Sequence, residues 1–334
     1  MNLVSQTIYD YWCRSRTKMS PSGWLTRNAP CCIHRGTTQD KRGRGGLKLD
    51  NNTEAITIKC FNCNFVCSFT PGKPLYPKML SMMKWLLIDD NNINQLKLES
   101  LRILSSTGNE IITHTRREIK PIELPECYLL QNELSKYSKH VDFLKSRGFN
   151  CDDFPFLVSP DLTYRSRVIL PFILQDTIIG YSARSIVPTE KLRYIMRMTT
   201  EFVFGLEWVL PDHEWVFVTE GLFDALSVKC LAIMHNEVGD AQAEIINDLQ
   251  KKIIIVPDLD VSGLAKRDNS LIDTAIDNGW SVSFPLWKEK DINAAYVNYG
   301  PLFVVKHLLD QSTNNTTTIR LKQKLLLDEL KSKK

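Results

Sequence analysis

The stretch WVFVTEGLFD, residues 215–224, decides how this chain is organised. Its first five residues are β-branched or aromatic, which predicts a short buried strand that ends at the carboxylate of Glu220. Gly221 permits a sharp exit from that strand. The apolar residues that follow have helical spacing over 222–234, which places Asp224 in the first helical turn, beside Glu220.

A second apolar run, KKIIIVPDLD at residues 251–260, ends in two carboxylates. Asp258 and Asp260 stand at i and i+2 on extended backbone, so both side chains point to one side. If the two strands are parallel neighbours, these acids meet Glu220 and Asp224 at the carboxyl edge of one sheet. Carboxylates that close repel one another unless a cation lies among them, and hard oxygen ligands suit Mg²⁺. Each acid alone is better explained as a helix cap or a solvated strand end, whereas all four in this order favour a magnesium site.

This arrangement resembles the Toprim fold of bacterial-type primases, type IA and type II topoisomerases and some nucleases. Glu220-Gly221 matches its Glu-Gly pair after a strand, Asp258-x-Asp260 matches the Asp-x-Asp after the next strand, and Gly263 matches a glycine that often follows. The resemblance implies a mostly parallel α/β sheet flanked by helices, with bounds that we expect near 213–298. It does not choose among these enzymes.

Composition indicates the cellular compartment more clearly than it indicates a binding partner. The 334 residues carry a net charge of only +4, and the length suggests about two domains, each able to bury a core. No apolar run approaches a membrane span, and residues 1–16 lack a secretory hydrophobic core. Nine cysteines, an odd number, favour a reducing compartment and metal binding over disulfides. We expect a soluble cytoplasmic protein with no membrane partner, in the host cell cytoplasm if the chain is phage-encoded.

Cysteine spacing in the amino-terminal part predicts a zinc ribbon over residues 1–75. Cys31-x-x-His34 and Cys60-x-x-Cys63 form two knuckles, whose side chains reach one ion across tight turns. We therefore expect Zn²⁺ to be bound by these four residues. Cys32 and Cys67 compete for places in the ligand set, and cysteines that only fill a small core are the alternative.

The two knuckles, in CIHR and KCFNCN, also resemble the amino-terminal zinc ribbon of bacterial and phage primases. That resemblance implies a module that touches single-stranded template. Basic and aromatic residues between and within the knuckles suit phosphate contacts and base stacking: Lys41, Arg42, Arg44, Lys48, Phe61 and Phe65. The alternative is a solvated basic hairpin.

The middle of the chain is expected to be a partly helical linker over 76–125, followed by a basic region over 126–212. Within the latter, residues 164–196 predict three strands, and they resemble the basic part of the primase polymerase core. The matching positions are Arg167, Pro171, Gly180, Arg184 and Arg193-Tyr194. Arginine suits phosphate because its fork donates two parallel hydrogen bonds. Ordinary edge-strand arginines are the alternative.

Residues 288–293, KEKDIN, resemble the Lys-Asp-x-Asn piece that closes the domain in primases. This makes Lys290 and Asp291 candidates for nucleotide or metal contacts, although Asp291 is an equally good helix N-cap. Residues 299–334 predict carboxyl-terminal helices with a charged tail, which could dock a partner or simply fray.

The order of these segments resembles bacterial-type primases, and the short length looks most like the primase subunits of T4-type and related phages. This implies synthesis of short RNA primers from ribonucleoside triphosphates on single-stranded DNA. Glu220, Asp258 and Asp260 would hold Mg²⁺ (or Mn²⁺), with support from Asp224. The basic set Arg167, Arg184 and Arg193 would hold triphosphate or template. The partners implied are a hexameric replicative helicase and a single-strand-binding protein.

Three other functions are weighed against this one. A type IA topoisomerase needs a catalytic tyrosine on further domains, for which the chain lacks room. A nuclease of the overcoming-lysogenization type would bring an ATPase, and no G-x-x-x-x-G-K-[ST] motif is present. A non-catalytic, zinc-bearing adaptor that binds single-stranded DNA is the third, and the retention of all the acids argues against it.

Overall fold

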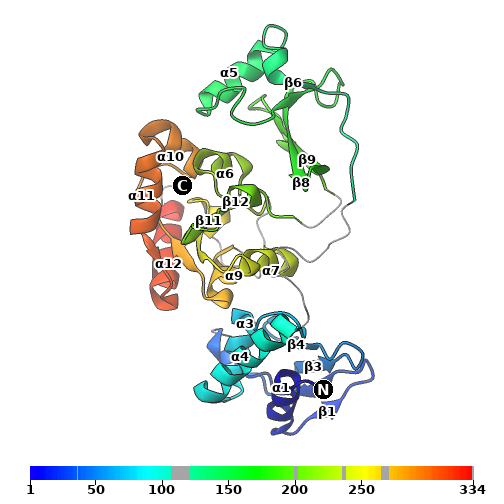
Figure 1. The fold of residues 1–334 in the computed structure, drawn as a ribbon. Coiled ribbons are helices and arrows are strands. Elements are labelled where there is room, and N and C mark those ends of the chain that lie inside the picture. The colour runs from blue at the N-terminus through cyan, green and yellow to red at the C-terminus, as the bar shows by residue number, and fades with distance from the viewer. Residues whose placement is uncertain (36, 107–119, 199–201, 235–237, 265–270, 333–334) are drawn as a thin grey trace. The chain divides into compact units, whose positions relative to one another are not determined.

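The computed structural model describes residues 1–35, 37–106, 120–198, 202–234, 238–264 and 271–332 (Figure 1). The chain forms two compact units. One comprises residues 1–112 with 277–279, and the other comprises residues 113–276 with 280–334. Among the described residues, no helix combines the length and the apolar character that a membrane crossing requires.

The first unit is built on an antiparallel sheet in which each strand pairs with the next along the chain. Its strands are β1 (Lys18–Met19), β2 (Leu25–Arg27), β3 (Gly45–Leu49), β4 (Ile56–Cys60) and β5 (Val66–Phe69). Alternation along β4 buries Ile56, Ile58 and Cys60 on one face. The helix α1 (Leu3–Cys13) adds Val4, Ile8 and Trp12 to the same core, at helical spacing.

Two further helices belong to this unit, α3 (Pro77–Trp85) and α4 (Asp90–Ser106). Met79, Met82 and Met83 of α3 are fully buried against the core that contains β4 and β5. The structure thus places 77–106 on the first unit, where the sequence predicted the start of a linker. Helical structure was expected in part of this segment, and α3 and α4 agree with that expectation. Their apolar residues pack on the core of the first unit. Residues 107–119 of the predicted linker lie outside the described residues.

The second unit holds two sheets. The antiparallel sheet has the order β10-β9-β8-β7-β6, and a short helix follows β6. Its elements are β6 (Tyr128–Leu129), α5 (Ser138–Ser146), β7 (Leu157–Val158), β8 (Arg167–Leu174), β9 (Thr177–Ser185) and β10 (Tyr194–Met198). The predicted strand–turn–strand–loop–strand order of residues 164–196 is confirmed.

The other sheet has the order β12-β11-β13-β14-β15, parallel except for β15. Its strands are β11 (Trp215–Thr219), β12 (Leu231–Ala232), β13 (Lys252–Val256), β14 (Ser281–Ser283) and β15 (Ser312–Thr313). The helices of this region are α6 (Leu222–Val228), α7 (Asp240–Asp248), α8 (Val261–Leu264), α9 (Leu271–Asn278), α10 (Ile292–Tyr299), α11 (Pro301–Asp310) and α12 (Thr316–Ser332). The expectation of an α+β, multidomain chain with a mostly parallel sheet flanked by helices is confirmed.

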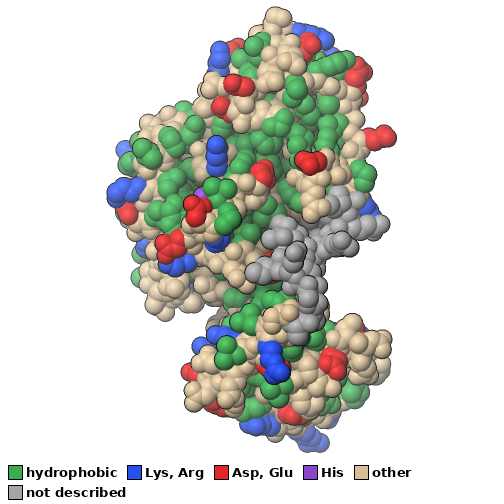
Figure 2. All heavy atoms as spheres, in the orientation of Figure 1, with side chains coloured by type: hydrophobic (Ala, Val, Ile, Leu, Met, Phe, Trp, Pro, Cys, Tyr) green, Lys and Arg blue, Asp and Glu red, His purple; other side chains and the backbone are tan. Residues whose placement is uncertain are grey.

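Alternation along the parallel strands divides their side chains between two cores. Val216, Val218 and Ile255 pack in the cluster that contains α7, α9 and α12. Phe217 and Ile254 pack on the other face, in a cluster that also takes in α6, α10, α11 and the antiparallel strand β8. One continuous core therefore joins the two sheets into a single unit. In the space-filling view, hydrophobic side chains gather in the region of α6, β8 and β9 (Figure 2).

Candidate metal centre and active site

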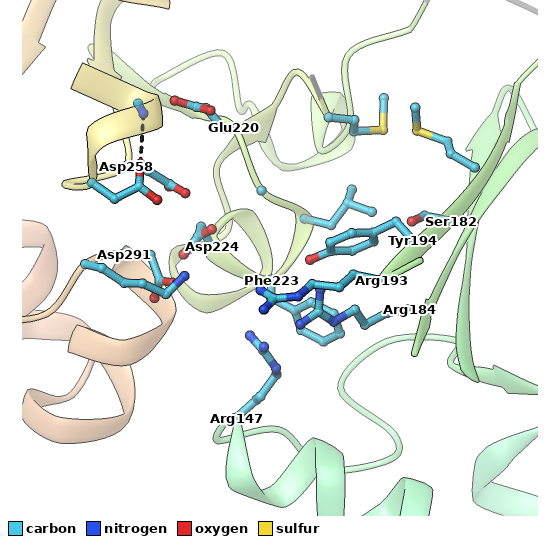
Figure 3. Close-up of a pocket in the computed structure, with 17 residues that line it drawn as sticks. Arg147, Ser182, Arg184, Arg193, Tyr194, Glu220, Phe223, Asp224, Asp258 and Asp291 are labelled. Atoms are coloured by element: carbon cyan, nitrogen blue, oxygen red, sulfur yellow. Dashed lines mark hydrogen bonds and ion pairs between the residues drawn. The ribbon is translucent and has the colours of Figure 1, made fainter. Parts of the chain in front are cut away.

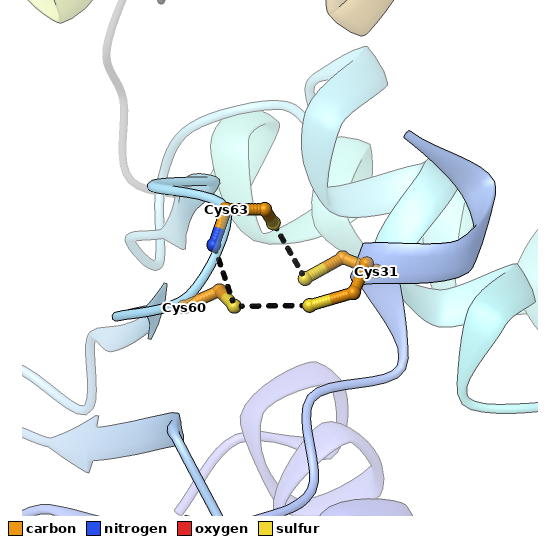
Figure 4. A group of neighbouring side chains, drawn as sticks. Cys31, Cys60 and Cys63 are labelled. Carbon is orange, nitrogen blue, oxygen red and sulfur yellow. Dashed lines mark hydrogen bonds between the residues drawn. The ribbon is translucent and has the colours of Figure 1, made fainter. Parts of the chain in front are cut away.

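Four cysteines of the first unit form a compact, buried cluster: Cys31, Cys32, Cys60 and Cys63 (Figure 4). Their ligand atoms all lie within 4.8 Å of one another. The Sγ atoms of Cys31 and Cys63 are 3.5 Å apart, as are those of Cys32 and Cys60. A zinc ion about 2.3 Å from four tetrahedral sulfurs separates neighbouring sulfurs by roughly 3.8 Å. The cluster therefore fits zinc.

The surroundings of the cluster suit thiolate ligands. Hydrogen bonds from the thiols of Cys31 and Cys60 lower the pKa of Cys63. The backbone N–H groups of Asn62 and Cys63 each lie 3.4 Å from Cys60 Sγ, and the Asn62 amide donates to Cys32 Sγ at 3.2 Å. Such donors stabilise negative charge on sulfur and orient the ligands.

The ligand set corrects the expectation that His34 completes the site. Cys31, Cys32 and His34 all lie in the short helix α2 (Cys31–His34), and both cysteines turn their sulfurs toward the knuckle of Cys60 and Cys63. His34 is exposed, and its ring stacks on Trp85 of α3 with ring centroids 5.2 Å apart. Cys32 thus stands in the place predicted for His34. Cys67, the other competitor, is buried in β5 outside the cluster.

The basic segment beside the cluster is partly structural. Asp40 is fully buried and accepts hydrogen bonds from the backbone of Ala29, Arg42 and Arg44. The Arg44 side chain also pairs with Asp40, at 3.2 Å. Burial opposes ionisation of Asp40, but these donors outweigh it and lower its pKa. A buried carboxylate therefore sets the path of the basic loop.

The two phenylalanines predicted for base stacking differ in access. Phe61 is 49% exposed, and its ring meets the ring of Trp24 edge-on at 5.7 Å between centroids. Lys59 Nζ lies 5.4 Å from the centre of the Phe61 ring. Phe65, in contrast, is only 1% exposed and packs against Trp85. Phe61 keeps a free ring surface for stacking, whereas Phe65 is a core residue.

In the second unit, strand register brings the predicted acids to one edge of the parallel sheet. Thr219, the last residue of β11, pairs with Val256, the last residue of β13. Glu220 and Asp258 follow these two ends directly or after one proline. A Cβ at Gly221 would collide with the Asp224 carboxylate, so the close approach of that side chain requires glycine.

The acids line one cavity of about 400 Å³, together with three arginines (Figure 3). The acidic residues on its wall are Glu220, Asp224, Asp258, Asp260 and Asp291. Among the described residues, only the cysteine cluster brings three or more ligand atoms within 4.8 Å of one another, so these carboxylates share a cavity without closing to that distance. Mg²⁺ commonly takes only one or two carboxylates and completes its shell with water and phosphate oxygens, so the set is compatible with magnesium.

Electrostatics at the acid wall favours a cation. Burial, and then the charges of Asp291 and Asp258, raise the pKa of Asp224 to about 8. Burial and the charge of Asp291 raise the pKa of Asp258 to about 6. Both shifts report negative charge held close together in a poorly solvated place. A divalent cation bound here would relieve that repulsion.

Asp260 and Asp291 also hold local backbone structure. Asp260 Oδ1 accepts from the N–H of Gly263 at 2.9 Å, at the start of α8. Asp291 caps α10 by accepting from the N–H of Ala294 at 2.9 Å, as the alternative interpretation of this residue predicted, and its other oxygen pairs with Lys290 at 2.8 Å. Burial disfavours the charged form of Lys290, but the bond to Asp291 and the neighbouring carboxylates outweigh it and raise its pKa.

The opposite wall of the cavity is basic and is set by the pairing of β9 with β10. Arg184 and Tyr194 are direct cross-strand partners, and the guanidinium lies 4.5 Å from the centre of the tyrosine ring. Ser182 and Met196 are the next pair on the same face, and they line the cavity as well. Arg193, just before β10, adds an exposed guanidinium.

Arg184 has the properties of an anion ligand. Its buried Nε atom lacks a hydrogen-bond partner in the described part of the chain. Burial lowers its pKa, and so do the charges of Arg147 and Arg193. Since arginine stays protonated in proteins, this is a cluster of uncompensated positive charge. Phosphate would satisfy both the free donor and the charge.

Arg167 departs from the expected site. It pairs with Ser185, one residue from Arg184, so its side chain lies on the other face of the sheet. Only 6% of it is exposed, and its guanidinium donates to the carbonyls of Thr163, Ala183, Leu192 and Arg193. Arg167 is absent from the wall of the cavity and ties the 185–193 loop to β8.

Arg147 is a residue of this cavity that sequence reasoning missed. It follows α5, in a segment where no motif marks it. The nearest sequence signal is the glycine that follows it, since Gly148 is the left-handed residue after the end of α5. Figure 3 shows Arg147, Arg184 and Arg193 directed toward the space that faces Asp224 and Asp291.

Comparisons with known proteins give distant structural likenesses. The chain matches no protein-family model and no curated protein. It is similar to the zinc-binding and RNA polymerase domains of the Aquifex aeolicus primase at 16% identity, over 94% of this chain and 86% of that one, with a TM-score of 0.44. It is also similar to the RNA polymerase domain of a Mycobacterium tuberculosis primase solved with DNA (16% identity, 46% of this chain, 55% of that one, TM-score 0.37). The primase fragment of the bacteriophage T7 primase-helicase matches at 12% identity, over 85% and 99% of the two chains, with a TM-score of 0.35.

Proposed function

We propose that this protein is a DNA primase, a nucleotidyltransferase that makes short RNA primers on single-stranded DNA. One observation carries the proposal: a cavity has carboxylates at the ends of two parallel strands on one side and three arginines on the other. A metal-bound triphosphate needs both walls, because its metal binds carboxylate and its phosphates bind guanidinium. The Toprim-like order of the acids supports the same assignment.

The acid wall supplies the metal ligands in this proposal. Glu220, Asp258 and Asp260 would hold Mg²⁺ or Mn²⁺, and the nearby Asp224 would add its charge. Bound metal would neutralise the leaving pyrophosphate and make the primer 3′-hydroxyl a better nucleophile. The raised pKa values of Asp224 and Asp258 fit this role, because a cation would favour the ionised form of both.

The basic wall binds and orients the nucleotide. Arg184 presents a buried, unpartnered Nε, and Arg193 and Arg147 stand beside it. Lys290 lies at the acid side of the same cavity, where its ammonium offsets part of the negative charge. Guanidinium groups in a poorly solvated wall hold a triphosphate in one orientation, which places the α-phosphate for in-line attack.

The cysteine cluster supports a role in template contact. It rigidifies a small sheet that carries basic residues and the exposed Phe61 ring. We propose that this surface holds single-stranded DNA by phosphate contacts and base stacking. The finer assignments follow the resemblance alone: a phage primase subunit that works with a hexameric helicase and a single-strand-binding protein in the cytoplasm. The bacteriophage T7 fragment comes from a protein described as a primase-helicase.

The direct test is primer synthesis by the purified, zinc-loaded chain. It is incubated with Mg²⁺, labelled ribonucleotides and single-stranded DNA templates of varied sequence. We expect short RNA products from the wild type, loss of product in Glu220→Gln, and wild-type yield in Asp142→Asn, a control acid on the exposed face of α5.

The other function classes predict different outcomes in the same assay. Cleavage of the template without RNA synthesis would indicate a Toprim nuclease or topoisomerase-like enzyme. Template binding with neither reaction, on every template and with Mn²⁺ as well as Mg²⁺, would indicate the zinc-bearing adaptor. Either outcome contradicts the proposal.

A further inference from the structure

The position of Arg147 is fixed by two aromatic rings and one amide. Its guanidinium lies 5.3 Å from the centre of the Phe143 ring and 4.7 Å from that of Phe223. Its Nη1 donates to Asn293 Oδ1 at 2.9 Å. No carboxylate within the described ranges forms an ion pair with it, so its charge remains available to an anion in the cavity.

Asn293 is a buried residue, 4% exposed, near the start of α10. Its side-chain nitrogen donates to the Arg147 carbonyl at 3.0 Å and to Ser227 Oγ at 2.9 Å. Ser227 in turn donates to the Phe223 carbonyl at 2.7 Å, so it is an acceptor toward Asn293. Only one orientation of the amide satisfies all these partners, since the guanidinium can only donate and the carbonyl can only accept.

The same residue also holds the acid wall. The backbone N–H of Asn293 donates to Asp224 Oδ1 at 2.8 Å. A continuous hydrogen-bonded path thus runs from the Arg147 guanidinium through Asn293 to the Asp224 carboxylate. It joins the end of α5, the start of α10 and α6, which are far apart in the sequence. The basic and acidic walls are connected at this point.

We propose that Asn293 is a positioning residue that sets Arg147 for the phosphates of a metal–nucleotide complex, at a fixed separation from the acid wall. This inference rests on the proposed function only for the identity of the nucleotide, because the anion site itself is tested without catalysis. Asparagine is suited to this role because a neutral side chain supplies both the acceptor for the guanidinium and the donors for the carbonyl and hydroxyl. Aspartate would lack the donors and add charge beside Asp224, and leucine would lack both.

The experiment measures binding of inorganic tripolyphosphate with Mg²⁺ by calorimetry, on the full zinc-loaded chain. Asn293→Ala removes the side-chain tether and keeps the backbone bond to Asp224. We expect both Asn293→Ala and Arg147→Ala to weaken binding about tenfold, the loss of one charge-assisted contact. Because the amide acts through the guanidinium, the double variant should bind no more weakly than Arg147→Ala. Asn150→Ala, an exposed position after α5, is the matched control and should bind as the wild type does.

Primer synthesis on the same variants separates this inference from the proposed function. We expect Asn293→Ala to raise the KM for ribonucleotides with a smaller change in kcat. A wild type that binds tripolyphosphate through Arg147 and Asn293 but makes no primers would reject the primase and keep the positioning role. Wild-type binding in Asn293→Ala, or losses that multiply in the double variant, would overturn the positioning role whatever the enzyme does.

If Asn293→Ala does not fold, Ser227→Ala carries the test. This substitution removes the Ser227 hydroxyl, which accepts a hydrogen bond from the Asn293 amide nitrogen, and it leaves the side-chain volume nearly unchanged. We expect binding about two- to threefold weaker than in the wild type, again with no further loss when Arg147→Ala is added. Unchanged binding in Ser227→Ala, or a loss that adds to that of Arg147→Ala, would contradict the proposal.

Discussion

Thr219 and Val256 are register partners at the ends of the parallel strands β11 and β13. Because of this pairing, Glu220 and Asp258 leave neighbouring strands at the same edge of the sheet, where α/β folds place their ligands. The arrangement depends on backbone hydrogen bonds and a buried apolar core, and does not need an attraction between the acids. The fold therefore holds the carboxylates close together despite their mutual repulsion, and a bound cation would relieve that repulsion.

The metal centre leads to a prediction about Cys32 and His34. Cys32→Ser should release zinc and lower the Tm of the first unit, because the ion would join α2 to the knuckle of Cys60 and Cys63. His34→Ala should keep one zinc per chain, since its ring only stacks on the Trp85 ring. Elemental analysis with circular dichroism measures both. Zinc loss in His34→Ala with full occupancy in Cys32→Ser would restore the Cys-x-x-His ligand set. Cys67→Ser, a buried cysteine outside the cluster, is the control for a changed core.

The two faces of β8 and β9 lead to a prediction about arginines. Arg184→Ala should raise the KM for ribonucleotides about tenfold, because a charge-assisted contact to phosphate is lost, and should leave the Tm nearly unchanged. Arg167→Ala should instead lower the free energy of unfolding by about 2–3 kcal/mol, since buried carbonyls lose their donor. Steady-state kinetics and thermal melts on both variants give the comparison, with Arg165→Ala as an exposed control. The assignment fails if the two variants exchange behaviours.

The acid wall leads to a prediction about pH. The pKa values of Asp258, about 6, and Asp224, about 8, lie above the unfolded value of about 3.9. The native state therefore binds more protons than the unfolded state in this range, so the metal-free protein loses stability as pH rises from about 4 through 6 and 8. Asp224→Asn stays neutral, so its Tm should gain on that of the wild type between pH 5 and pH 8.5 without divalent ions. A Tm difference that is constant with pH would show that Asp224 titrates normally, and Asp142→Asn gives the baseline.

Much of the second unit could be predicted from the sequence because its signals are local. WVFVT and KIIIV are buried strands by composition alone, and the acids follow them directly. The convergence of the acids also needed strand adjacency, which short apolar runs and intervening helices favour in parallel sheets. The cavity's second wall was only partly predictable. Arg184 and Arg167 both belong to strands. The face of the sheet on which each side chain lies depends on the register of strand pairing, which the sequence does not reveal.

The other departures from the sequence predictions also depend on contacts between residues that are distant in the sequence. Cys31-x-x-His34 has good knuckle spacing, but α2 directs Cys32 into the cluster and leaves His34 outside. The His34 ring packs instead on Trp85 of α3. Arg147 carries no motif, because its place depends on an amide 146 positions away along the chain. A partly helical linker is the expectation for 77–106, whereas the methionines of α3 and Ile93 and Leu96 of α4 pack on the core of the first unit, a long-range contact that no local pattern marks.

The central claim, that the acids at the ends of β11 and β13 hold the catalytic metal, is tested most directly at Asp258. Asp258→Asn is measured twice on one preparation: for primer synthesis with Mg²⁺, and for Tm without divalent ions at pH 8. Loss of one ligand charge should lower primer synthesis by about a hundredfold or more, while relief of repulsion keeps the metal-free Tm equal to or above that of the wild type. An Asp258→Asn protein that melts earlier than the wild type yet makes primers at the wild-type rate would show a structural carboxylate, and would contradict the account.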